Sequence, residues 1–479
     1  MTLLIRPRRD PARDRAGDRA PATDHDPNTD HTPNTDHTGA AASSGPLDVR
    51  AIRRHFAFPE HGRIVTNNAA STQPPRELVE LYRSLSPWYE NVHRGQSAAA
   101  RHTTDLFEDA YDTIASWINA PGRRCLVLCR NTTEAHNTVM YSLLTEFRDG
   151  DNVVTTMLEH NSNYVPWYGL THEILPRFGR RVECRLARFD ADGNVDLEHL
   201  ASLVDRRTKL VCCTGASNFT GSRPDLALLR KIADGSGYLQ PNGERRSRLL
   251  IDGAQLVPGR AVDVQRSGVD YLSFSFHKML APFGVGVLYA KEHLLRHGRP
   301  FLYGGDMIAE GGVAPDHVDY NDLPWKFSAG TPNILGVIVS AQALRLLADL
   351  VNPSERPLFG GHGPIPYAVV ERTMDRLARH TAQLTGRAHR ALAGMEGLTV
   401  YGPRERAPLI AFNKAGTDPF TVAKALDQRG VEARAGCHCA TLAHHALRLD
   451  PPASCRLSFA VYNTEEDVDR AVAAVSSAP

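Results

Sequence analysis

The chain has 479 residues and a mass of 52.6 kDa, which is typical of a protein with two or three domains of about 150 residues each. Hydrophobic residues make up 42% and charged residues 23%, the composition of a globular protein that can bury large cores. Its 55 basic and 54 acidic residues leave a net charge of +1, so we expect no nucleic-acid partner, because binding to phosphates usually requires a basic excess.

The sequence contains no obvious membrane or export segment. No stretch approaches the roughly 18 consecutive apolar residues of a membrane span, and the apolar run at residues 3–5 is too short for a signal peptide. We therefore expect a cytoplasmic protein without a membrane segment. Eight cysteines are too few for a disulfide framework in so long a chain. Lysine is rare, seven of the 55 basic residues, so the position of each lysine is informative.

Residues 1–46 are predicted to form a disordered tail, because few apolar side chains are present there to offset the entropy of ordering. A repeat, Thr-Asp-His-x-Pro-Asn, contains His25, His31 and His37, for which a solvated tail is a better explanation than weak metal binding. Residues 47–335 are predicted to form an N-terminal arm and a large domain. Residues 336–479 are predicted to form a small C-terminal domain.

Within the large domain, short apolar segments alternate with helical patterns such as those over residues 133–147 and 225–234. This alternation predicts an α/β domain with a mostly parallel sheet that is covered on both faces. The last two strands are joined too tightly for a helical crossover, so the sheet is expected to be mixed. The seven predicted strands cover residues 126–129, 152–156, 182–188, 210–214, 249–252, 271–276 and 284–290.

The remaining third of the chain has a different pattern. Helical patterns over residues 335–351 and 366–395 are followed by strand patterns near residues 409–412 and 456–459. This order predicts a smaller α+β domain.

Polar residues follow several of the predicted strands, where ligands bind in open α/β sheets. Thr132 and Thr133 open a helix whose free N–H groups suit a phosphate, although a plain N-cap is the commoner role. Asp252 ends a buried strand and needs a cation or several donors. His277 and Lys278 follow the next strand, although alone they are typical of a solvated surface.

His160 and Asn218 also follow predicted strands, in segments that alone are typical of polar turns. Taken together, phosphate donors, a carboxylate and a lysine lie at one edge of the sheet. Pyridoxal phosphate requires this set, with the acid for its pyridinium nitrogen and the lysine for a Schiff base. The sequence therefore predicts a pyridoxal phosphate site.

Nine stretches carry a more specific pattern, in this order: NNAAS (67–71), VHRG (92–95), RNTTEA (130–135), EHNSNYVPW (159–167), DGAQ (252–255), HK (277–278), AGTPN (329–333), RAGCHCA (434–440) and CRLS (455–458). With them the chain, from about residue 50 onward, resembles the class V aminotransferases. The resemblance is greatest to their cysteine desulfurase branch, of the selenocysteine-lyase-like type. It implies a fold-type-I pyridoxal phosphate enzyme with a large domain built on a mostly parallel seven-stranded sheet and a smaller α+β C-terminal domain.

The resemblance also implies the cofactor contacts. Lys278 would carry pyridoxal phosphate covalently and move the Cα proton, and Asp252 would bind the pyridinium nitrogen. His160 would stack on the ring. Gln255 and Asn218 would lie near its phenolic oxygen. The implied phosphate ligands are Thr132, Thr133, Ser275, His277 and, across a homodimer interface, Thr331.

Substrate contacts are implied in the same way. Arg456 would bind the substrate carboxylate with both arms of its guanidinium, a geometry that suits this side chain. Arg434 matches a second family arginine near the substrate. Asn68, His93 and Arg94 lie in matching stretches and are predicted to bind substrate as well.

Cys439 distinguishes the desulfurase branch from its relatives. In that branch a thiolate at this place attacks the substrate sulfur and becomes a persulfide, so the resemblance implies conversion of L-cysteine to L-alanine. A protein sulfur acceptor is then a candidate partner. The alternatives are a bystander cysteine in a flexible loop, or a zinc-binding Cys-x-Cys pair. The sequence offers no second ligand pair, and we expect no metal site.

Several residues depart from the family pattern, namely Asn67, Asn131, Phe276 and Cys437, where Asp, Gly, Gly and His are usual. These changes affect the substrate pocket more than the cofactor set. The alternative function is therefore a pyridoxal phosphate-dependent C–S lyase, epimerase or aminotransferase acting on another amino acid in a biosynthetic pathway. A non-catalytic sulfur- or metal-handling protein is a further alternative, against which Lys278, Asp252 and Arg456 argue.

Overall fold

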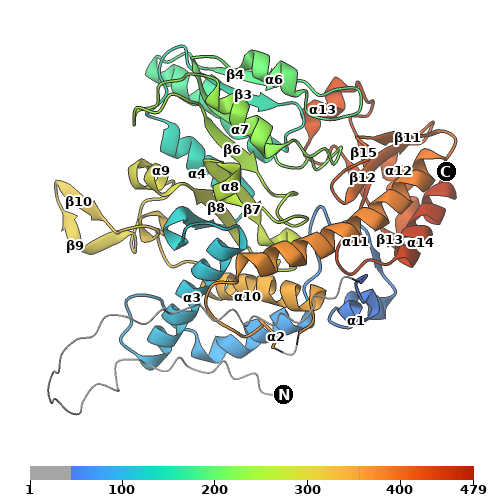
Figure 1. Ribbon diagram of the computed structural model, residues 1–479, viewed down its shortest axis with the longest axis horizontal. Coiled ribbons are helices and arrows are strands. Elements are labelled where there is room, and N and C mark those ends of the chain that lie inside the picture. Colours follow the sequence, from blue (N-terminus) through green and yellow to red (C-terminus); the bar gives the residue numbers. More distant parts are fainter. Residues whose placement is uncertain (1–44, 355) are drawn as a thin grey trace, which may run out of the picture. The chain divides into compact units, whose positions relative to one another are not determined.

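The computed structural model describes residues 45–354 and 356–479, so residues 1–44 of the predicted tail, with the histidine repeat, lie outside the described residues. A seven-stranded sheet in the order β2-β8-β7-β6-β5-β3-β4 forms the centre of the described chain (Figure 1). The strands from β4 to β7 in this order are parallel, whereas β8 is antiparallel to both of its neighbours. Their bounds are β2 (Leu126–Cys129), β3 (Asn152–Thr156), β4 (Glu183–Ala187), β5 (Thr208–Thr214), β6 (Arg248–Asp252), β7 (Tyr271–Ser275) and β8 (Gly286–Ala290).

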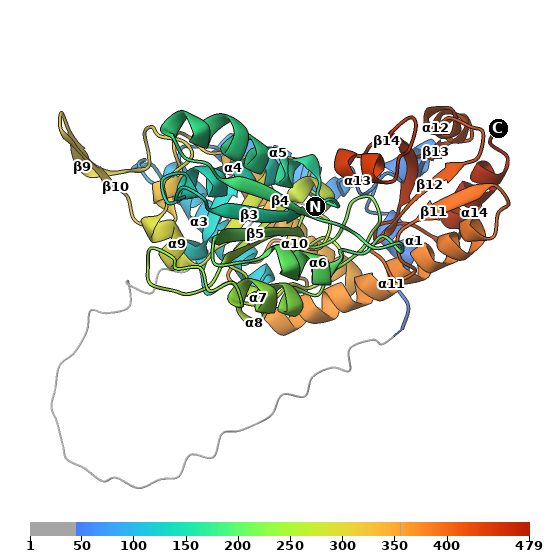
Figure 2. The same ribbon diagram turned by 90° about the horizontal axis from the view of Figure 1, so that it is seen from above.

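Helices lie on both faces of this sheet, with α4 and α5 on one face and α7 and α8 on the other (Figure 2). Every residue of β3, β5, β6, β7 and β8 is buried, which accounts for the apolar runs in the sequence. The prediction of an α/β fold with a mixed, mostly parallel sheet is confirmed. The helices of this region are α4 (Thr132–Leu143), α5 (Val165–Gly169), α6 (Leu197–Leu203), α7 (Leu226–Asp234), α8 (Val264–Ser267) and α9 (Glu292–His297).

A helical layer that includes α10 (Ile334–Val351) packs beside the sheet. This helix corrects the expectation that no segment has the length and hydropathy of a membrane span. Among the described residues, α10 alone has the length and the mean hydropathy, 1.8, of a membrane span, and 89% of it is buried inside the protein. The sequence analysis missed this stretch because polar residues such as Arg345 interrupt its apolar run. The buried Arg345 guanidinium donates to Thr113 Oγ1 at 2.8 Å, which is an interaction of a protein core. The helices packed around α10 are α2 (Arg76–Leu85), α3 (Ala98–Trp117) and α11 (Tyr367–Ala393).

The C-terminal part contains a second, antiparallel sheet in the order β11-β12-β15-β14, as the α+β prediction requires. It has its own hydrophobic core, in which Phe412, Leu426 and Leu457 are fully buried. The N-terminal arm joins this core, because Ile64 of β1 packs in it and β1 pairs with β13. The elements are α1 (Val49–Arg53), β1 (Ile64–Val65), β11 (Leu398–Tyr401), β12 (Leu409–Lys414), α12 (Pro419–Asp427), β13 (Val431–Glu432), β14 (Arg434–Gly436), α13 (Thr441–Ala446), β15 (Ser454–Ser458) and α14 (Glu465–Ser476).

A hairpin of β9 (Ile308–Ala314) and β10 (His317–Tyr320) projects from the large-sheet region (Figure 1). The sequence analysis did not predict it. Its residues are mostly exposed on both faces, so no alternation of apolar and polar residues marks these strands. Residues 46–479 form one compact unit that holds both sheets, and the proposed domain boundary at residue 335 stays a prediction.

Candidate active site

A cavity of about 260 Å³ lies at the carboxyl ends of the parallel strands β3, β5, β6 and β7. The large sheet contributes one side of its lining, and the β14–β15 region of the small sheet contributes the other. The cavity brings together twelve of the predicted site residues: Thr132, Thr133, His160, Asn218, Asp252, Gln255, Ser275, His277, Lys278, Arg434, Cys439 and Arg456.

One end of the cavity is formed by the first turn of α4. The Thr132 backbone N–H donates to Ser275 Oγ at 2.8 Å, and the Thr132 and Ser275 hydroxyls lie 2.7 Å apart. This approach of α4 to β7 passes over β8, where Gly286 is required, because a Cβ there would lie 2.5 Å from Asn131 Cα. Hydroxyls and free N–H groups at a helix N-terminus are suited to bind phosphate.

Asp252 and Lys278 come from the ends of the adjacent strands β6 and β7. Asp252 is 3% exposed, and one of its carboxylate oxygens accepts a hydrogen bond from the Ala254 N–H at 2.9 Å. Lys278 lies in the 3-10 turn that follows β7. Burial, opposed by Asp252 and assisted by Arg456 and Arg434, lowers the pKa of Lys278 to about 8. About one-tenth of this amine is therefore neutral and nucleophilic at pH 7, far more than for an ordinary lysine.

His160 is held by a chain of hydrogen bonds that begins on β7. His136 Nε2 lies 2.7 Å from Ser273 Oγ, and its Nδ1 lies 2.8 Å from the Ser162 carbonyl oxygen. A carbonyl can only accept, so His136 Nδ1 carries the proton and Nε2 accepts from Ser273. The Ser162 N–H in turn donates to His160 Nδ1 at 3.0 Å.

This chain fixes the state of the His160 ring. Because its Nδ1 accepts, a neutral His160 carries its proton on Nε2. Burial lowers the pKa of His160 to about 4, with Asp252 opposing the shift and Lys278 adding to it. The ring is therefore neutral at physiological pH.

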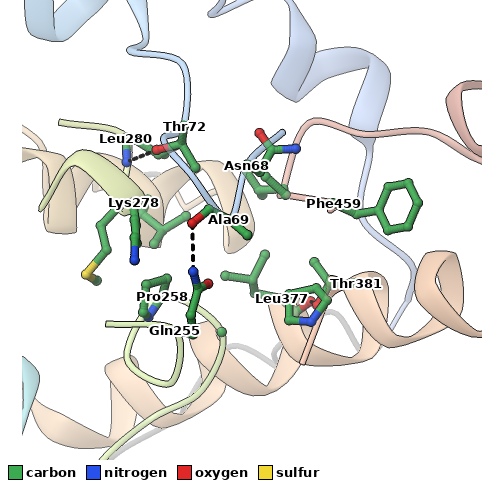
Figure 3. A pocket seen from close by; sticks show the side chains of 16 residues that line it. Asn68, Ala69, Thr72, Gln255, Pro258, Lys278, Leu280, Leu377, Thr381 and Phe459 are labelled. Carbon is green, nitrogen blue, oxygen red and sulfur yellow. Dashed lines mark hydrogen bonds between the residues drawn. The ribbon is translucent and has the colours of Figure 1, made fainter. Parts of the chain in front are cut away.

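A smaller cavity of about 60 Å³ adjoins the main one (Figure 3). The two cavities share Ala69, Gln255 and Lys278 in their linings. Gln255 Nε2 donates to the Ala69 carbonyl at 2.7 Å, the dashed line at the centre of Figure 3. This bond fixes the Gln255 amide and leaves its Oε1 as the acceptor. The further walls, which include Pro258, Leu377 and Phe459, are mostly apolar.

Arg434 on β14 and Arg456 on β15 lie directly opposite each other in the small sheet. Arg456 is 2% exposed, its Nη1 donates to the Asn218 carbonyl at 2.6 Å, and its Nε has no hydrogen-bond partner. Burial, followed by the charge of Arg434, lowers the pKa of Arg456 to about 9. A buried guanidinium that has a free donor and lies beside a second arginine is suited to bind an anion such as a carboxylate.

Cys439 lies in a tight turn between β14 and α13. The Ala440 N–H donates to the Cys437 carbonyl at 2.8 Å, and the central residues His438 and Cys439 have φ of 52° and 57°. Asn218 Nδ2 donates to the His438 carbonyl at 2.6 Å, and the Asn161 N–H donates to the Cys439 carbonyl at 2.6 Å. Two loops of the large sheet thus hold the turn against the cavity, with the Cys439 side chain partly exposed.

The donor set fits pyridoxal phosphate. Thr132, Ser275 and their neighbours supply hydrogen-bond donors for a phosphate at one end, and Asp252 supplies a carboxylate for a ring nitrogen. Lys278 supplies an amine in the same cavity, and the free Arg456 Nε is available for a substrate anion. The residues that would hold the cofactor are therefore present together.

Four predicted site residues lie outside this cavity. Asn68 is occupied elsewhere, since its Nδ2 donates to the Val65 and Ser458 carbonyls. His93 contacts the rings of Phe107 and Trp325, and Arg94 pairs with Asp306 at 3.0 Å. Thr331 is exposed, and its inter-subunit role stays a prediction.

The sequence analysis did not identify several residues that shape the site. Ser162, Thr214 and His438 line the cavity, and His136 hydrogen-bonds to the Ser162 carbonyl. Glu159 is buried and accepts hydrogen bonds from Thr156, Asn163 and the Thr214 N–H. These bonds join the ends of β3 and β5. Burial raises the pKa of Glu159 to about 8. Glu159 and Ser162 belong to the stretch 159–167, so the motif was a usable signal, whereas His136 lies in a helix that gives none.

Comparisons with known proteins agree with this geometry. The family profile described as Aminotransferase class-V matches residues 64–353 and 365–471. A probable cysteine desulfurase of Halobacterium salinarum is 35% identical over 91% of this chain and 98% of its own length. The crystal structure of the cysteine desulfurase CsdA from Escherichia coli aligns with a TM-score of 0.76 at 30% identity, over 90% of this chain and 98% of that one. The cysteine desulfurase of Thermococcus onnurineus NA1 aligns with a TM-score of 0.77 at 28% identity, over the same shares.

Proposed function

The chain belongs to the class-V aminotransferase family of pyridoxal phosphate-dependent enzymes, and within that family we propose that it is a cysteine desulfurase. It would convert L-cysteine to L-alanine and hold the sulfur as a persulfide on Cys439. One observation favours a desulfurase over the other activities of the family. A partly exposed cysteine lines the same cavity as the lysine, the aspartate and the arginine pair. Transamination or epimerisation needs no such thiol.

The protein's own residues would orient the substrate. Arg456 would bind the L-cysteine carboxylate with its free Nε and a second guanidinium nitrogen. Arg434 lies opposite and adds a second positive charge. The Asn218 carbonyl holds the Arg456 guanidinium in place at 2.6 Å, so the carboxylate would be fixed relative to Lys278 and Cys439.

When bound, pyridoxal phosphate supplies an electron sink for the charge that develops at the substrate Cα. Asp252 would keep a proton on the ring nitrogen, since it lies 3% exposed with an oxygen directed by Ala254 N–H. Lys278 would take the proton from the substrate Cα. Its pKa of about 8 leaves part of the amine free to accept a proton near neutral pH.

Cys439 would perform the sulfur transfer. Its thiolate attacks the substrate sulfur, an S–S bond forms, and the substrate C–S bond breaks. The products are L-alanine and a Cys439 persulfide, so all atoms of L-cysteine are accounted for without an external oxidant. The turn that carries Cys439 is held by Asn161 and Asn218, which places the thiol at the wall opposite the sheet.

Three further assignments belong to this proposal. A homodimer would place the exposed Thr331 at the phosphate of the neighbouring subunit. A protein would accept the persulfide sulfur. The enzyme would work in the cytoplasm.

The experiment that tests the function is a product assay with purified enzyme and L-cysteine. We expect wild type to form alanine, and sulfide in the presence of a reducing thiol, and we expect Cys439→Ala to form neither above the uncatalysed rate. Cys184→Ala, which removes a partly exposed cysteine on β4, is the matched control and should behave as wild type. Wild type with bound cofactor but without alanine formation would overturn the proposal.

A further inference from the structure

The turn that carries Cys439 also carries a second cysteine, for which the proposed reaction has no role. Cys437 is the first residue of this turn, and the Ala440 N–H donates to its carbonyl at 2.8 Å. The positive φ of both His438 and Cys439 is the pattern of a type I′ turn. Two residues apart, the Cα atoms of Cys437 and Cys439 lie within about 7.6 Å even in an extended chain. The reversal of the chain at this turn brings the two Cα atoms nearer than that limit.

The two thiols have different surroundings. Cys439 lines the cavity, whereas Cys437 does not line it and is partly exposed outside. The Thr441 hydroxyl donates to Cys437 Sγ at 3.5 Å. Five of the other cysteines are buried, and burial raises the pKa of their thiols; they are Cys125, Cys129, Cys212, Cys213 and Cys455. Cys437 is thus the accessible thiol next to Cys439.

We propose that Cys437 is a second sulfur carrier, which takes the terminal sulfur from Cys439 and presents it outside the cavity. The inference rests on the proposed function, because it requires the Cys439 persulfide. The Cys437 thiolate attacks the terminal sulfur, a new S–S bond forms on Cys437, and the bond to Cys439 Sγ breaks. Cys439 leaves as a thiolate while the proton stays on the transferred sulfur. The exchange needs no oxidant or reductant.

This relay has a structural rationale. An acceptor that attacked Cys439 directly would have to reach a thiol in the wall of the cavity, which Arg434 and Arg456 also line. Transfer over one turn moves the sulfur to the protein surface and frees Cys439 for the next L-cysteine. The same exchange explains why a thiol is useful at position 437, where the imidazole usual in the family would carry no sulfur.

The first test locates the sulfur. Enzyme is mixed with one equivalent of L-cysteine, quenched with iodoacetamide and digested with trypsin, which cuts after Arg434 and Arg448 and leaves both cysteines in one peptide. Fragmentation in the mass spectrometer then assigns the alkylated persulfide to one cysteine or the other. In wild type we expect the additional sulfur on Cys437 in at least half of the labelled peptides. In Cys437→Ser we expect it on Cys439 alone.

Two further variants make the test specific. In Cys439→Ser we expect no additional sulfur on Cys437, because the relay begins at Cys439. Cys184→Ser should match wild type. Wild type that carries the sulfur on Cys439 alone would overturn the relay and leave the proposed function intact. Sulfur on Cys437 in Cys439→Ser would overturn the relay and also the role of Cys439 in the proposed function. Absence of both persulfide and alanine in wild type would overturn the proposed function itself.

A second measurement does not depend on peptide fragments. After the same single turnover, cyanide is added and thiocyanate is followed over time, which reports how accessible the terminal sulfur is. We expect its release to be about tenfold slower in Cys437→Ser than in wild type, with Cys437→Ala equal to Cys437→Ser. Equal rates in wild type and both variants would overturn the relay.

Discussion

The cavity has two walls that differ in how completely their polar groups are paired. The sheet wall comprises Thr132, Asp252, Ser275 and Lys278 at the ends of parallel strands, and its hydroxyls, N–H groups and carboxylate contact each other or the adjacent backbone. The turn wall comprises Arg434, His438, Cys439 and Arg456, and there the Arg456 Nε and His438 Nδ1 are buried without partners. Its backbone also contains two adjacent residues with positive φ.

This difference in the pairing of polar groups assigns a different task to each wall. A paired and regular wall is preorganised, so it can hold a cofactor that stays through every turnover. Unpaired buried donors are costly unless a ligand satisfies them, so the turn wall is arranged for a substrate that comes and goes. On this account, changes in the sheet wall remove all chemistry, and changes in the turn wall remove sulfur transfer while the cofactor stays bound.

The largest effect is expected for Lys278→Ala. It removes both the amine that would hold the cofactor covalently and the base for the Cα proton, and we expect alanine formation to fall by at least ~10³-fold. Alanine release from L-cysteine and the visible absorbance of the bound cofactor are the measurements. Thermal unfolding close to that of wild type is the control. A variant that kept a tenth of the activity would show that the sheet wall does not carry the reaction.

Arg456→Lys should act on substrate binding. Lysine lacks the planar fork, and hydrogen bonds to charged groups are worth about 1.5–3 kcal/mol, so KM for L-cysteine should rise by about 10- to 100-fold. Cofactor absorbance should be unchanged. Arg429→Lys is the matched control, since Arg429 donates to Ala425 and Ser477 carbonyls away from the cavity. Loss of the cofactor with an unchanged KM would place Arg456 with the sheet wall instead.

The pH dependence of cofactor loading reports on Lys278 directly. Burial lowers its pKa to about 8, so the neutral amine rises with pH from about one-tenth of the population at pH 7 to about nine-tenths at pH 9. The rate at which apoenzyme binds pyridoxal phosphate should therefore increase about tenfold over this range and then level off. A free lysine derivative in the same buffers corrects for titration of the cofactor. A rate that continues to climb tenfold for each further pH unit would contradict the lowered pKa.

The smallest effect is expected for His136→Phe, which breaks the chain that orients His160. The Ser162 carbonyl would lose its donor, and we expect kcat to fall by about three- to fivefold, a fraction of what a positioned acid–base group contributes. His136→Asn can place an amide N–H near the position of Nδ1 and should restore most of kcat. If both variants had the same kcat, the effect would come from packing and not from the orientation of His160.

The sequence predicted the sheet wall better than the turn wall. Strands such as β6 and β7 are buried on both faces and read as apolar runs, so their ends and the polar residues that follow, Asp252 and Lys278, could be located. The order of the motifs then placed Arg434, Cys439 and Arg456 in the same site. Neither pattern could reveal the orphaned Arg456 Nε, because a free donor depends on the packing of distant loops.

Other features depend on contacts that no local pattern records. His136 lies within α4 and gains its role only from Ser273 and Ser162, which are more than twenty residues away. Asn68 lies in a recognisable motif, yet its amide binds the backbone of Val65 and Ser458, with Tyr462 donating to its oxygen. Thr331 lies exposed, where a single chain offers no partner to test its predicted role.

The separation of tasks between the two walls is tested most directly by titrating L-cysteine into Cys439→Ala while recording the visible spectrum of the cofactor and the alanine formed. The account predicts that the cofactor is present, that its spectrum changes with L-cysteine at a concentration similar to that for wild type, and that no alanine accumulates. Alanine formation at a rate near that of wild type would contradict the account, as would a variant that neither holds the cofactor nor responds to L-cysteine.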